Sequence, residues 1–400
     1  MPASCNEKAY ELGAQGSSIR QLFAYGQARK AQIGDDKVFD FSIGNPSVPA
    51  PAEVKQAIVE ALDEPSLELH GYTPAAGLPS TRTAIADVLN ARHGTSYTAA
   101  DLYLTMGAAA AIDACINAVC EPGDEVVVIA PFFPEYRVWI EAAGCRCVLS
   151  PARADSQIDL DDLASRITAR TRAVIINSPN NPTGTVYPAE ALHELAGVRR
   201  AASKMNGRTV YLIADEPYRE IAYEGVEVPW VPSIYENTLV CYSYSKSLSL
   251  PGERIGYALV PDTMPAHDEV YAAVCGAGRA LGYVCAPSLI QKAIEKCCGL
   301  PSDVAAYAEN RDLLFGALSE MGYECVEPRG AFYLWVRALE PDAKAFSACA
   351  RDGHELLLVP SDDFGVEGWV RISYCVDKAT IERSLPAFRA LIEEYRANRA

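Results

Sequence analysis

The chain has 400 residues, a length that suits two domains or one large α/β domain with a smaller one, and half of the residues are apolar, as in globular proteins. Its formal net charge of −17 would repel nucleic acid and anionic membranes, so neither is expected as a partner. No window approaches the roughly eighteen apolar residues that a membrane span needs, and residues 1–20 contain no apolar signal segment. We therefore expect a cytoplasmic protein.

The first forty residues predict a helical arm, because Ile19, Leu22 and Phe23 are spaced as on one face of a helix. A loop rich in glycine and proline follows over residues 41–51, where Gly44 allows backbone or ligand to approach closely. We place the first domain boundary there. The prediction is a large domain over residues 46–288 and a small domain built from residues 1–45 and 289–400.

Short β-branched runs alternate with longer helical patterns between Pro51 and Pro287. This alternation predicts an α/β domain with a mostly parallel sheet and helices on both faces. Sheets of this kind place their chemistry at the carboxyl ends of the strands. The expected strands cover residues 125–130, 173–177, 210–214 and 238–242.

The pattern changes beyond residue 288. A long helix is predicted over residues 301–321, followed by strands over 330–336 and 369–374 and by a charged terminal helix. Strands and helices segregated in this way predict a smaller α+β domain.

The thirteen cysteines are odd in number and scattered, and Cys115, Cys120 and Cys241 lie in apolar segments. This pattern is typical of buried free thiols in a reducing compartment. Neither the cysteines nor the five histidines have the spacing of a zinc site, so no metal is expected.

Small residues open the helix predicted after residues 102–104. Exposed backbone N–H groups and the positive end of the helix dipole would let a phosphate bind at Gly107, Ala108 and Ala109. Ordinary helix packing is the alternative.

Two proline-containing turns surround consecutive asparagines in Asn177-Ser-Pro-Asn-Asn-Pro-Thr-Gly. They predict a rigid loop that aims the Asn181 amide at a definite point, although a turn with capping asparagines has the same pattern.

Asp215 ends an apolar strand, where a carboxylate is costly to leave without a cation partner. A protonated ring nitrogen of a cofactor is one such partner, and the Tyr218 phenol lies three residues further on. A strand-end aspartate that caps the next helix is the other interpretation.

Lys246 follows the last predicted strand of this domain, in a run of hydroxyls and small residues from Ser243 to Arg254. A lysine in such surroundings can lose its proton near neutral pH and attack an aldehyde. A solvated loop lysine is the alternative. In the second domain, Arg371 lies in an apolar strand, where it could bind a carboxylate or form a structural ion pair.

Taken together, these stretches resemble, in content and in order, the class I/II aminotransferases, which are pyridoxal-phosphate-dependent enzymes of the aspartate aminotransferase fold (fold type I). The resemblance runs from Phe41 to Tyr395. The motifs that carry it are Tyr72-Thr-Pro-Ala-Ala-Gly-Leu, the Gly107 turn, Pro122-Gly-Asp-Glu-Val, Ser178-Pro-Asn-Asn-Pro-Thr-Gly, Ala214-Asp-Glu-Pro-Tyr, Ser243-Tyr-Ser-Lys, Arg254-Ile-Gly, Gly330-Ala-Phe-Tyr and Arg371.

The resemblance implies roles for residues around the cofactor ring. Lys246 corresponds to the lysine that bonds to pyridoxal 5'-phosphate and later moves the substrate proton. Asp215 would pair with the ring nitrogen, and Asn181 and Tyr218 with the ring hydroxyl oxygen. Phe133 lies where the family stacks an aromatic side chain on the ring.

For the phosphate, the resemblance implies the Gly107 turn with the amides of Ala108 and Ala109, together with Ser243 and Arg254. Tyr72 would reach the phosphate from the neighbouring subunit, so a homodimer is expected.

For the substrate, the resemblance implies Arg371 at the α-carboxylate, with Gly44 and Asn181 close by. Arg279 lies near the place where aspartate-specific members bind a distal carboxylate, but the flanking residues align only with a one-residue slip. A surface or interface arginine is the competing interpretation.

The expected function is the transfer of an amino group from an L-amino acid, aspartate-like, aromatic or aliphatic, to a 2-oxo acid such as 2-oxoglutarate in a ping-pong cycle. A C–S β-lyase on the same fold is the alternative, because the same residues serve elimination. A non-catalytic regulatory pyridoxal-phosphate-binding module is a third possibility, which the absence of a basic N-terminal helix-turn-helix disfavours.

Overall fold

The computed structural model describes residues 5–398, which form two compact units. The larger unit comprises Asn45–Ala306 and Arg329–Ala331. The smaller unit comprises the described residues up to Gly44, Tyr307–Pro328, and those from Phe332 onward. The sequence places the end of the large domain at residue 288, whereas the larger compact unit continues through a further helix to residue 306.

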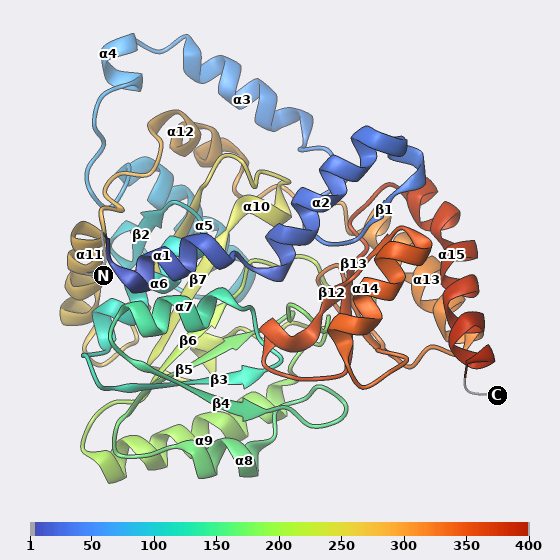
Figure 1. Ribbon diagram of the computed structural model, residues 1–400. Helices are drawn as coiled ribbons and strands as arrows, with labels where there is room; N and C mark the ends of the chain where they lie inside the picture. Colours follow the sequence, from blue (N-terminus) through green and yellow to red (C-terminus); the bar gives the residue numbers. More distant parts are fainter. Residues whose placement is uncertain (1–4, 399–400) are drawn as a thin grey trace. The chain divides into compact units, whose positions relative to one another are not determined.

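A seven-stranded sheet forms the centre of the larger unit (Figure 1). The strand order is β2-β8-β7-β6-β5-β3-β4, and every pairing is parallel except the two made by β8. The predicted mostly parallel sheet is thereby confirmed. The strands are β2 (Leu102–Thr105), β3 (Glu125–Ala130), β4 (Arg146–Pro151), β5 (Thr171–Asn177), β6 (Tyr211–Asp215), β7 (Thr238–Ser243) and β8 (Gly256–Leu259).

Four of these strands, β3, β5, β6 and β7, coincide with the predicted runs to within two residues at each end. Their residues are nearly all buried, because helices cover both faces of the sheet and β-branched side chains pack well there. The sequence did not predict β4 or β8. β4 is an edge strand whose residues are mostly half-buried or exposed, and β8 is an antiparallel strand of only four residues.

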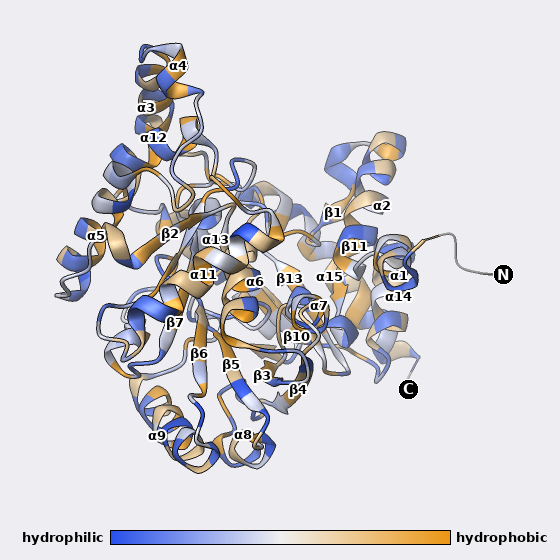
Figure 2. Ribbon diagram, turned by 90° about the vertical axis from the view of Figure 1, so that its left-hand side faces the viewer, coloured by the Kyte–Doolittle hydropathy of each residue, from blue (hydrophilic) through white to orange (hydrophobic). Residues whose placement is uncertain are grey.

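Helices cover the sheet in two layers. On one face, α3, α5 and α12 pack against β2, β7 and β8, and α8 and α9 pack against the strands toward β4. On the other face, α6 crosses β5 to β8 and is itself covered by α11. In Figure 2 the central strands are mainly apolar and the outer helices carry the polar residues. The helices are α3 (Ala52–Leu62), α4 (Ser66–Leu69), α5 (Pro79–His93), α6 (Ala108–Val119), α7 (Glu135–Ala142), α8 (Leu160–Arg166), α9 (Ala189–Asn206), α10 (Tyr244–Ser247), α11 (His267–Leu281) and α12 (Ser288–Cys297).

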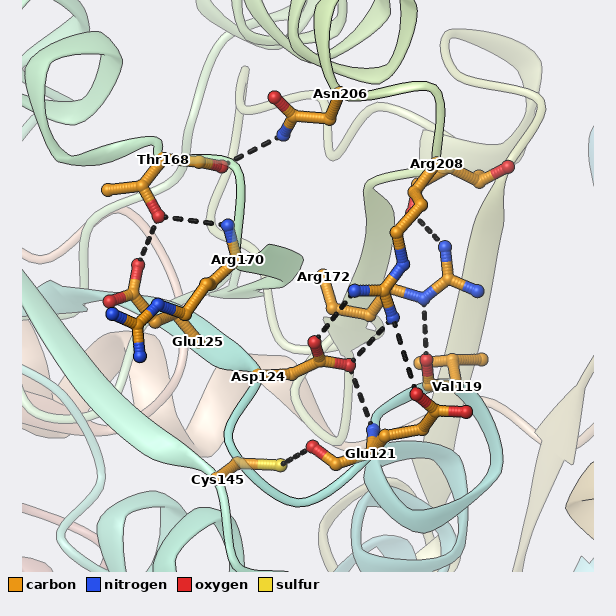
Figure 3. Close-up of polar contacts among 11 residues, drawn as sticks. Val119, Glu121, Asp124, Glu125, Cys145, Thr168, Arg170, Arg172, Asn206 and Arg208 are labelled. Carbon is orange, nitrogen blue, oxygen red and sulfur yellow. Dashed lines mark hydrogen bonds and ion pairs between the residues drawn. The ribbon is translucent and has the colours of Figure 1, made fainter.

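Ion pairs and hydrogen bonds hold the loops at the amino edge of this sheet (Figure 3). Arg208 donates two hydrogen bonds to the Asp124 carboxylate, of 2.9 and 3.0 Å, just before β3 begins. The Thr168 hydroxyl donates to Glu125 at 2.6 Å and ties the entry of β5 to β3. Both carboxylates are buried, so these partners offset their cost of desolvation.

The opposite, carboxyl edge gathers several candidate residues by strand register alone. Asn177 and Asp215 are paired neighbours at the ends of β5 and β6. Because β8 runs antiparallel, its first residue, Gly256, pairs with both Thr105 and Ser243 at the ends of β2 and β7. The loop that precedes β8 therefore reaches the same edge.

The smaller unit contains a four-stranded antiparallel sheet in the order β12-β13-β10-β9 and a parallel pair β1-β11. Trp335 of β10, Val359 of β12 and Phe364 pack with Leu22 in its core. The strands are β1 (Phe39–Asp40), β9 (Cys325–Val326), β10 (Tyr333–Arg337), β11 (Leu356–Leu357), β12 (Val359–Pro360) and β13 (Trp369–Ser373); the helices are α1 (Glu7–Gln15), α2 (Ser18–Ile33), α13 (Val304–Met321), α14 (Ala343–His354) and α15 (Lys378–Ala397).

This arrangement confirms the predicted α+β character of the C-terminal region. Over residues 5–398, no helix combines the length and apolarity needed to cross a membrane. Within the same residues, no cluster of three or more His, Cys, Asp or Glu side chains could hold a metal ion.

Candidate active site

Asp215 is a buried carboxylate at the end of β6, and only one of its two side-chain oxygens accepts a hydrogen bond from a described residue. The Tyr136 hydroxyl donates a hydrogen bond to Oδ2, and the Asn177 side-chain amide donates to the Asp215 backbone carbonyl at 2.8 Å. Oδ1 is buried and has no hydrogen-bond partner among the described residues. The residues after Asp215 form a turn, so this aspartate does not cap a helix.

Burial raises the pKa of Asp215 to about 7, and the hydrogen bond from Tyr136 acts in the opposite direction. A carboxylate that has lost its water is stabilised most by a cation or a strong donor at its open oxygen. The site therefore favours a ligand with a protonated group beside Oδ1.

Tyr136 was not among the residues selected from the sequence. It lies near the start of α7, shortly after β3, and is itself buried. The rule that chemistry gathers at the carboxyl ends of strands applies to β3 as well, so this position could have been considered. Phe133 lies in the same turn, with its ring edge-on to Tyr136 at a centroid distance of 5.7 Å.

The asparagine loop after β5 is rigid because its own side chains bind its backbone. The Asn181 N–H donates to the Asn177 side-chain oxygen at 2.7 Å. Asn180 accepts from the Thr183 N–H at 3.1 Å and from its hydroxyl at 2.9 Å. Asn181 is thereby fixed in a buried position at the same edge as Asp215.

Lys246 lies in α10, a single helical turn that follows β7 directly. Ser243 caps this turn, because its hydroxyl accepts from the Ser245 N–H at 3.1 Å. The Ser302 hydroxyl donates to the Ser247 carbonyl at 2.8 Å and holds the other end. Lys246 is partly exposed, whereas Ser245 and Ser247 on either side of it are buried.

The turn before α6 brings Gly107 and Arg254 together. Gly107 has φ +83°, and a Cβ atom placed there would lie 2.9 Å from the Arg254 guanidinium. Arg254 donates to the Met106 carbonyl at 3.2 Å. Ala108 and Ala109 begin α6, so their N–H groups lie in the first turn, where a helix supplies no acceptor of its own.

Three further predicted residues differ in exposure. Tyr218 is buried in the turn after Asp215. Tyr72 has a relative exposure of 102% and is fully accessible to a second molecule. Arg279 is exposed in the last turn of α11, so neither Arg279 nor Tyr72 is part of the buried cluster around Asp215.

In the smaller unit, Arg371 and Gly44 both lie against Tyr333. The Arg371 guanidinium is 4.7 Å from the centre of the Tyr333 ring and donates to the Ser42 carbonyl at 2.6 Å. A Cβ atom at position 44 would lie 2.1 Å from the Tyr333 hydroxyl oxygen. Only glycine leaves room for this ring, which in turn covers the arginine.

The sequence pattern of the family described as Aminotransferase class I and II matches residues 36–388. The chain belongs to this family. The expected resemblance is therefore confirmed, and so is the cofactor, because class I/II aminotransferases use pyridoxal phosphate.

Several known proteins are similar to this aminotransferase over most of their length. The aspartate/prephenate aminotransferase of Thermus thermophilus is 30% identical over 393 residues, which is 97% of this chain and 94% of that protein. A crystal structure of an aminotransferase from Eubacterium rectale has a TM-score of 0.95 at 55% identity and covers 98% of this chain and 99% of its own. Aspartate aminotransferase from Thermus thermophilus with maleate has a TM-score of 0.84 at 28% identity, over 94% and 97% of the two chains.

The residues of this aminotransferase fit a pyridoxal phosphate molecule on two independent grounds. The open, buried Asp215 oxygen would be stabilised by a protonated pyridine nitrogen. The Gly107 turn, the first turn of α6 and the Arg254 guanidinium offer N–H donors and positive charge to a phosphate.

Without cofactor, the native chain and the Asp215→Asn variant should differ in their free energies of unfolding by an amount that depends on pH. The free energy of unfolding of the native chain minus that of the variant should fall as pH rises from about 4 to about 7 and then level off. The sign follows from the raised pKa of Asp215, to about 7, because the folded state then holds a proton that the unfolded chain has already lost. Chemical denaturation of both proteins across this range measures the difference. Tyr136→Phe should move the levelling point to higher pH, since it removes the bond that lowers this pKa. A difference that does not vary with pH would contradict the raised pKa.

Proposed function

We propose that this aminotransferase moves the amino group of an L-amino acid to a 2-oxo acid such as 2-oxoglutarate in a ping-pong cycle. The buried Asp215 oxygen without a partner is the observation that carries the proposal. Its surroundings suit a positive charge on the ligand, and such a charge is what makes a pyridine ring an electron acceptor.

When bound, pyridoxal phosphate supplies an aldehyde that bonds to amines and a ring that accepts the electron pair left when a substrate loses its α-proton. Lys246 would bind that aldehyde through Nζ and, once released by the incoming amino acid, move the proton between the substrate Cα and the cofactor carbon. Asp215 would keep the ring nitrogen protonated, with Tyr136 and Asn177 holding the carboxylate in place. Asn181 and Tyr218 would donate to the ring hydroxyl oxygen, and Phe133 would pack on the ring.

The phosphate would be held by the N–H groups of Ala108 and Ala109, with Ser243 and Arg254. Gly107 leaves room for the Arg254 side chain, which supports a joint role for these two residues. Helix α6 has twelve residues, long enough for its dipole to favour an anion at this end.

Arg371 would bind the substrate α-carboxylate through its planar guanidinium, and Gly44 and Asn181 would also contribute to substrate binding. A two-pronged contact of this kind fixes the amino acid so that its Cα–H bond stands perpendicular to the cofactor ring. The named substrates of the relatives include aspartate, prephenate and aromatic amino acids. Arg279 would bind a distal carboxylate only if the donor is dicarboxylic.

Mixing the purified enzyme with a panel of L-amino acids and 2-oxoglutarate should produce glutamate, detected by chromatography. Lys246→Ala should lower this activity at least ~10³-fold, because it removes both the amine that binds the aldehyde and the proton carrier. Its circular dichroism should be native, since Lys246 is partly exposed. Release of pyruvate and ammonia without glutamate would instead indicate a β-lyase.

Arg371→Lys should raise KM for the amino acid about 10- to 100-fold, because lysine cannot form the paired hydrogen bonds to a carboxylate. Arg337→Lys is the matched control, because Arg337 is an exposed residue of the neighbouring strand β10. Steady-state kinetics of both variants measure the effect. Equal KM values in the two variants would remove Arg371 from the substrate site.

We further propose that the active unit is a homodimer in which Tyr72 of one subunit binds the phosphate held by the other. The complete exposure of Tyr72 in the single chain supports this arrangement. Each site would then need residues from two subunits.

Refolding a mixture of Lys246→Ala and Tyr72→Ala chains should therefore restore up to about a quarter of native activity, because half of the dimers are hybrids with one intact site. Each variant refolded alone is the control. Absence of recovery, together with a monomer mass in sedimentation, would overturn the dimer.

A further inference from the structure

Arg219 is a buried arginine beside the candidate site to which none of the proposed roles applies. It lies in the turn after β6, one residue beyond Tyr218, and its guanidinium lies between two aromatic rings. The guanidinium carbon is 4.9 Å from the centre of the Trp230 ring and 4.6 Å from that of Tyr242. Cation–π contacts of this kind are strongest when the cation is removed from water, as it is here.

Polar contacts fix the direction of the same guanidinium. Its Nη2 donates to the Tyr257 hydroxyl at 3.1 Å, and its Nε lies 3.2 Å from the Glu216 carboxylate. Glu216 is also buried, and its backbone N–H donates to the Cys241 carbonyl on β7 at 2.9 Å. Arg219 therefore joins the turn after β6 to strands β7 and β8.

Tyr242 extends these contacts to the lysine turn. Its ring packs on Arg219, and its hydroxyl lies 2.8 Å from the Ser247 hydroxyl, next to Lys246 in sequence. The same hydroxyl donates to Glu220 at 2.7 Å. One continuous set of contacts thus runs from the turn that carries Asp215 and Tyr218 to the turn that carries Lys246.

A buried ion pair by itself adds little to the stability of a protein. Removing the two charges from water costs several kcal/mol per ion, and apolar residues of similar size often serve equally well. Buried polar groups can instead fix one arrangement of the surrounding segments. Here the pair lies within the turn that carries Asp215 and Tyr218, and Tyr242 links Arg219 to the turn that carries Lys246.

We propose that Arg219 is a positioning residue for the reaction. It holds the turn that carries the Tyr218 phenol and the turn that carries the Lys246 amine in a fixed position relative to each other. The inference rests on the proposed roles of Lys246 and Tyr218. Arg219 acts through its ring contacts and through Glu216 and does not itself contact substrate or cofactor.

Arg219→Met tests this inference, because methionine fills much of the volume without charge or hydrogen bonds. Burial raises the pKa of Glu216 to about 7, while the Arg219 charge works in the opposite direction, so loss of the arginine lets Glu216 take up a proton and the fold persist. We expect kcat to fall about 10- to 100-fold with KM for the amino acid changed less than about 3-fold, as for a small misplacement of reacting groups. The absorbance maximum of the bound cofactor should shift, and Arg219→Lys should recover part of both effects.

Arg199→Met is the matched control. Arg199 is also buried, its guanidinium lies 4.2 Å from the centre of the Tyr235 ring, and it donates to the carbonyl of Val210, the residue before β6. Arg199 belongs to α9, and this hydrogen bond lies at the amino end of β6, whereas Asp215 lies at the carboxyl end. Its loss should lower the melting temperature as much as Arg219→Met does, with kcat and the cofactor spectrum unchanged.

Tyr242→Phe provides a second, milder variant if Arg219→Met does not fold. It keeps the ring over Arg219 and removes only the hydroxyl beside Ser247 and Glu220. A fall in kcat and a spectral shift in the same direction, of smaller size, would support the proposal.

Native kcat and spectrum in the folded variants, or equal effects in the Arg199 control, would overturn it. A wild-type protein without a cofactor absorbance band would overturn the proposed function instead, which separates the two failures.

Discussion

A carboxylate withdrawn from water is the constraint on which the larger unit depends. Asp215 ends the central strand β6, and the helices on both faces of the sheet leave it no solvent. Tyr136 satisfies one of its oxygens and leaves the other open. Such a group is costly by itself, and the proposed pairing with the cofactor would offset that cost, so cofactor binding and fold stability would be coupled at this residue.

The surrounding elements keep that carboxylate in a fixed place. Strand register puts Asn177 beside it, and the rigid asparagine loop follows from the same strand end. The antiparallel insertion of β8 returns the chain to the carboxyl edge, so Arg254 approaches the turn before α6 from a distant part of the sequence. The site is assembled by the topology of the sheet more than by any local motif.

The sequence predicted what depends on local pattern. The buried strands β3, β5, β6 and β7 appear as β-branched runs, and Asp215 and Lys246 stand out because each carries charge within a few residues of the end of such a run. Tyr136 follows β3 as a strand-end residue, but its contact with Asp215, like that of Arg219 with Tyr257, joins residues far apart in the chain and has no local signal. Strand β8 was missed for a similar reason, since a short antiparallel strand has no distinctive period. Helix α12 joins the larger unit through an apolar stripe whose partners, α3 and α5, are distant in sequence.

The close approach of Gly256 to Gly107 limits the substitutions that evolution can introduce in this part of the enzyme. A Cβ atom at Gly256 would lie 2.1 Å from the Tyr242 carbonyl oxygen and 3.0 Å from the Gly107 backbone. A side chain at Gly256 would displace backbone, and one at Gly107 would meet the Arg254 guanidinium at a φ of +83°, so this corner, the proposed phosphate site, tolerates few single substitutions. Exposed segments such as the loop of Tyr72 or the end of α11 carry no such constraint, because their side chains can be exchanged one at a time without disturbing the sheet.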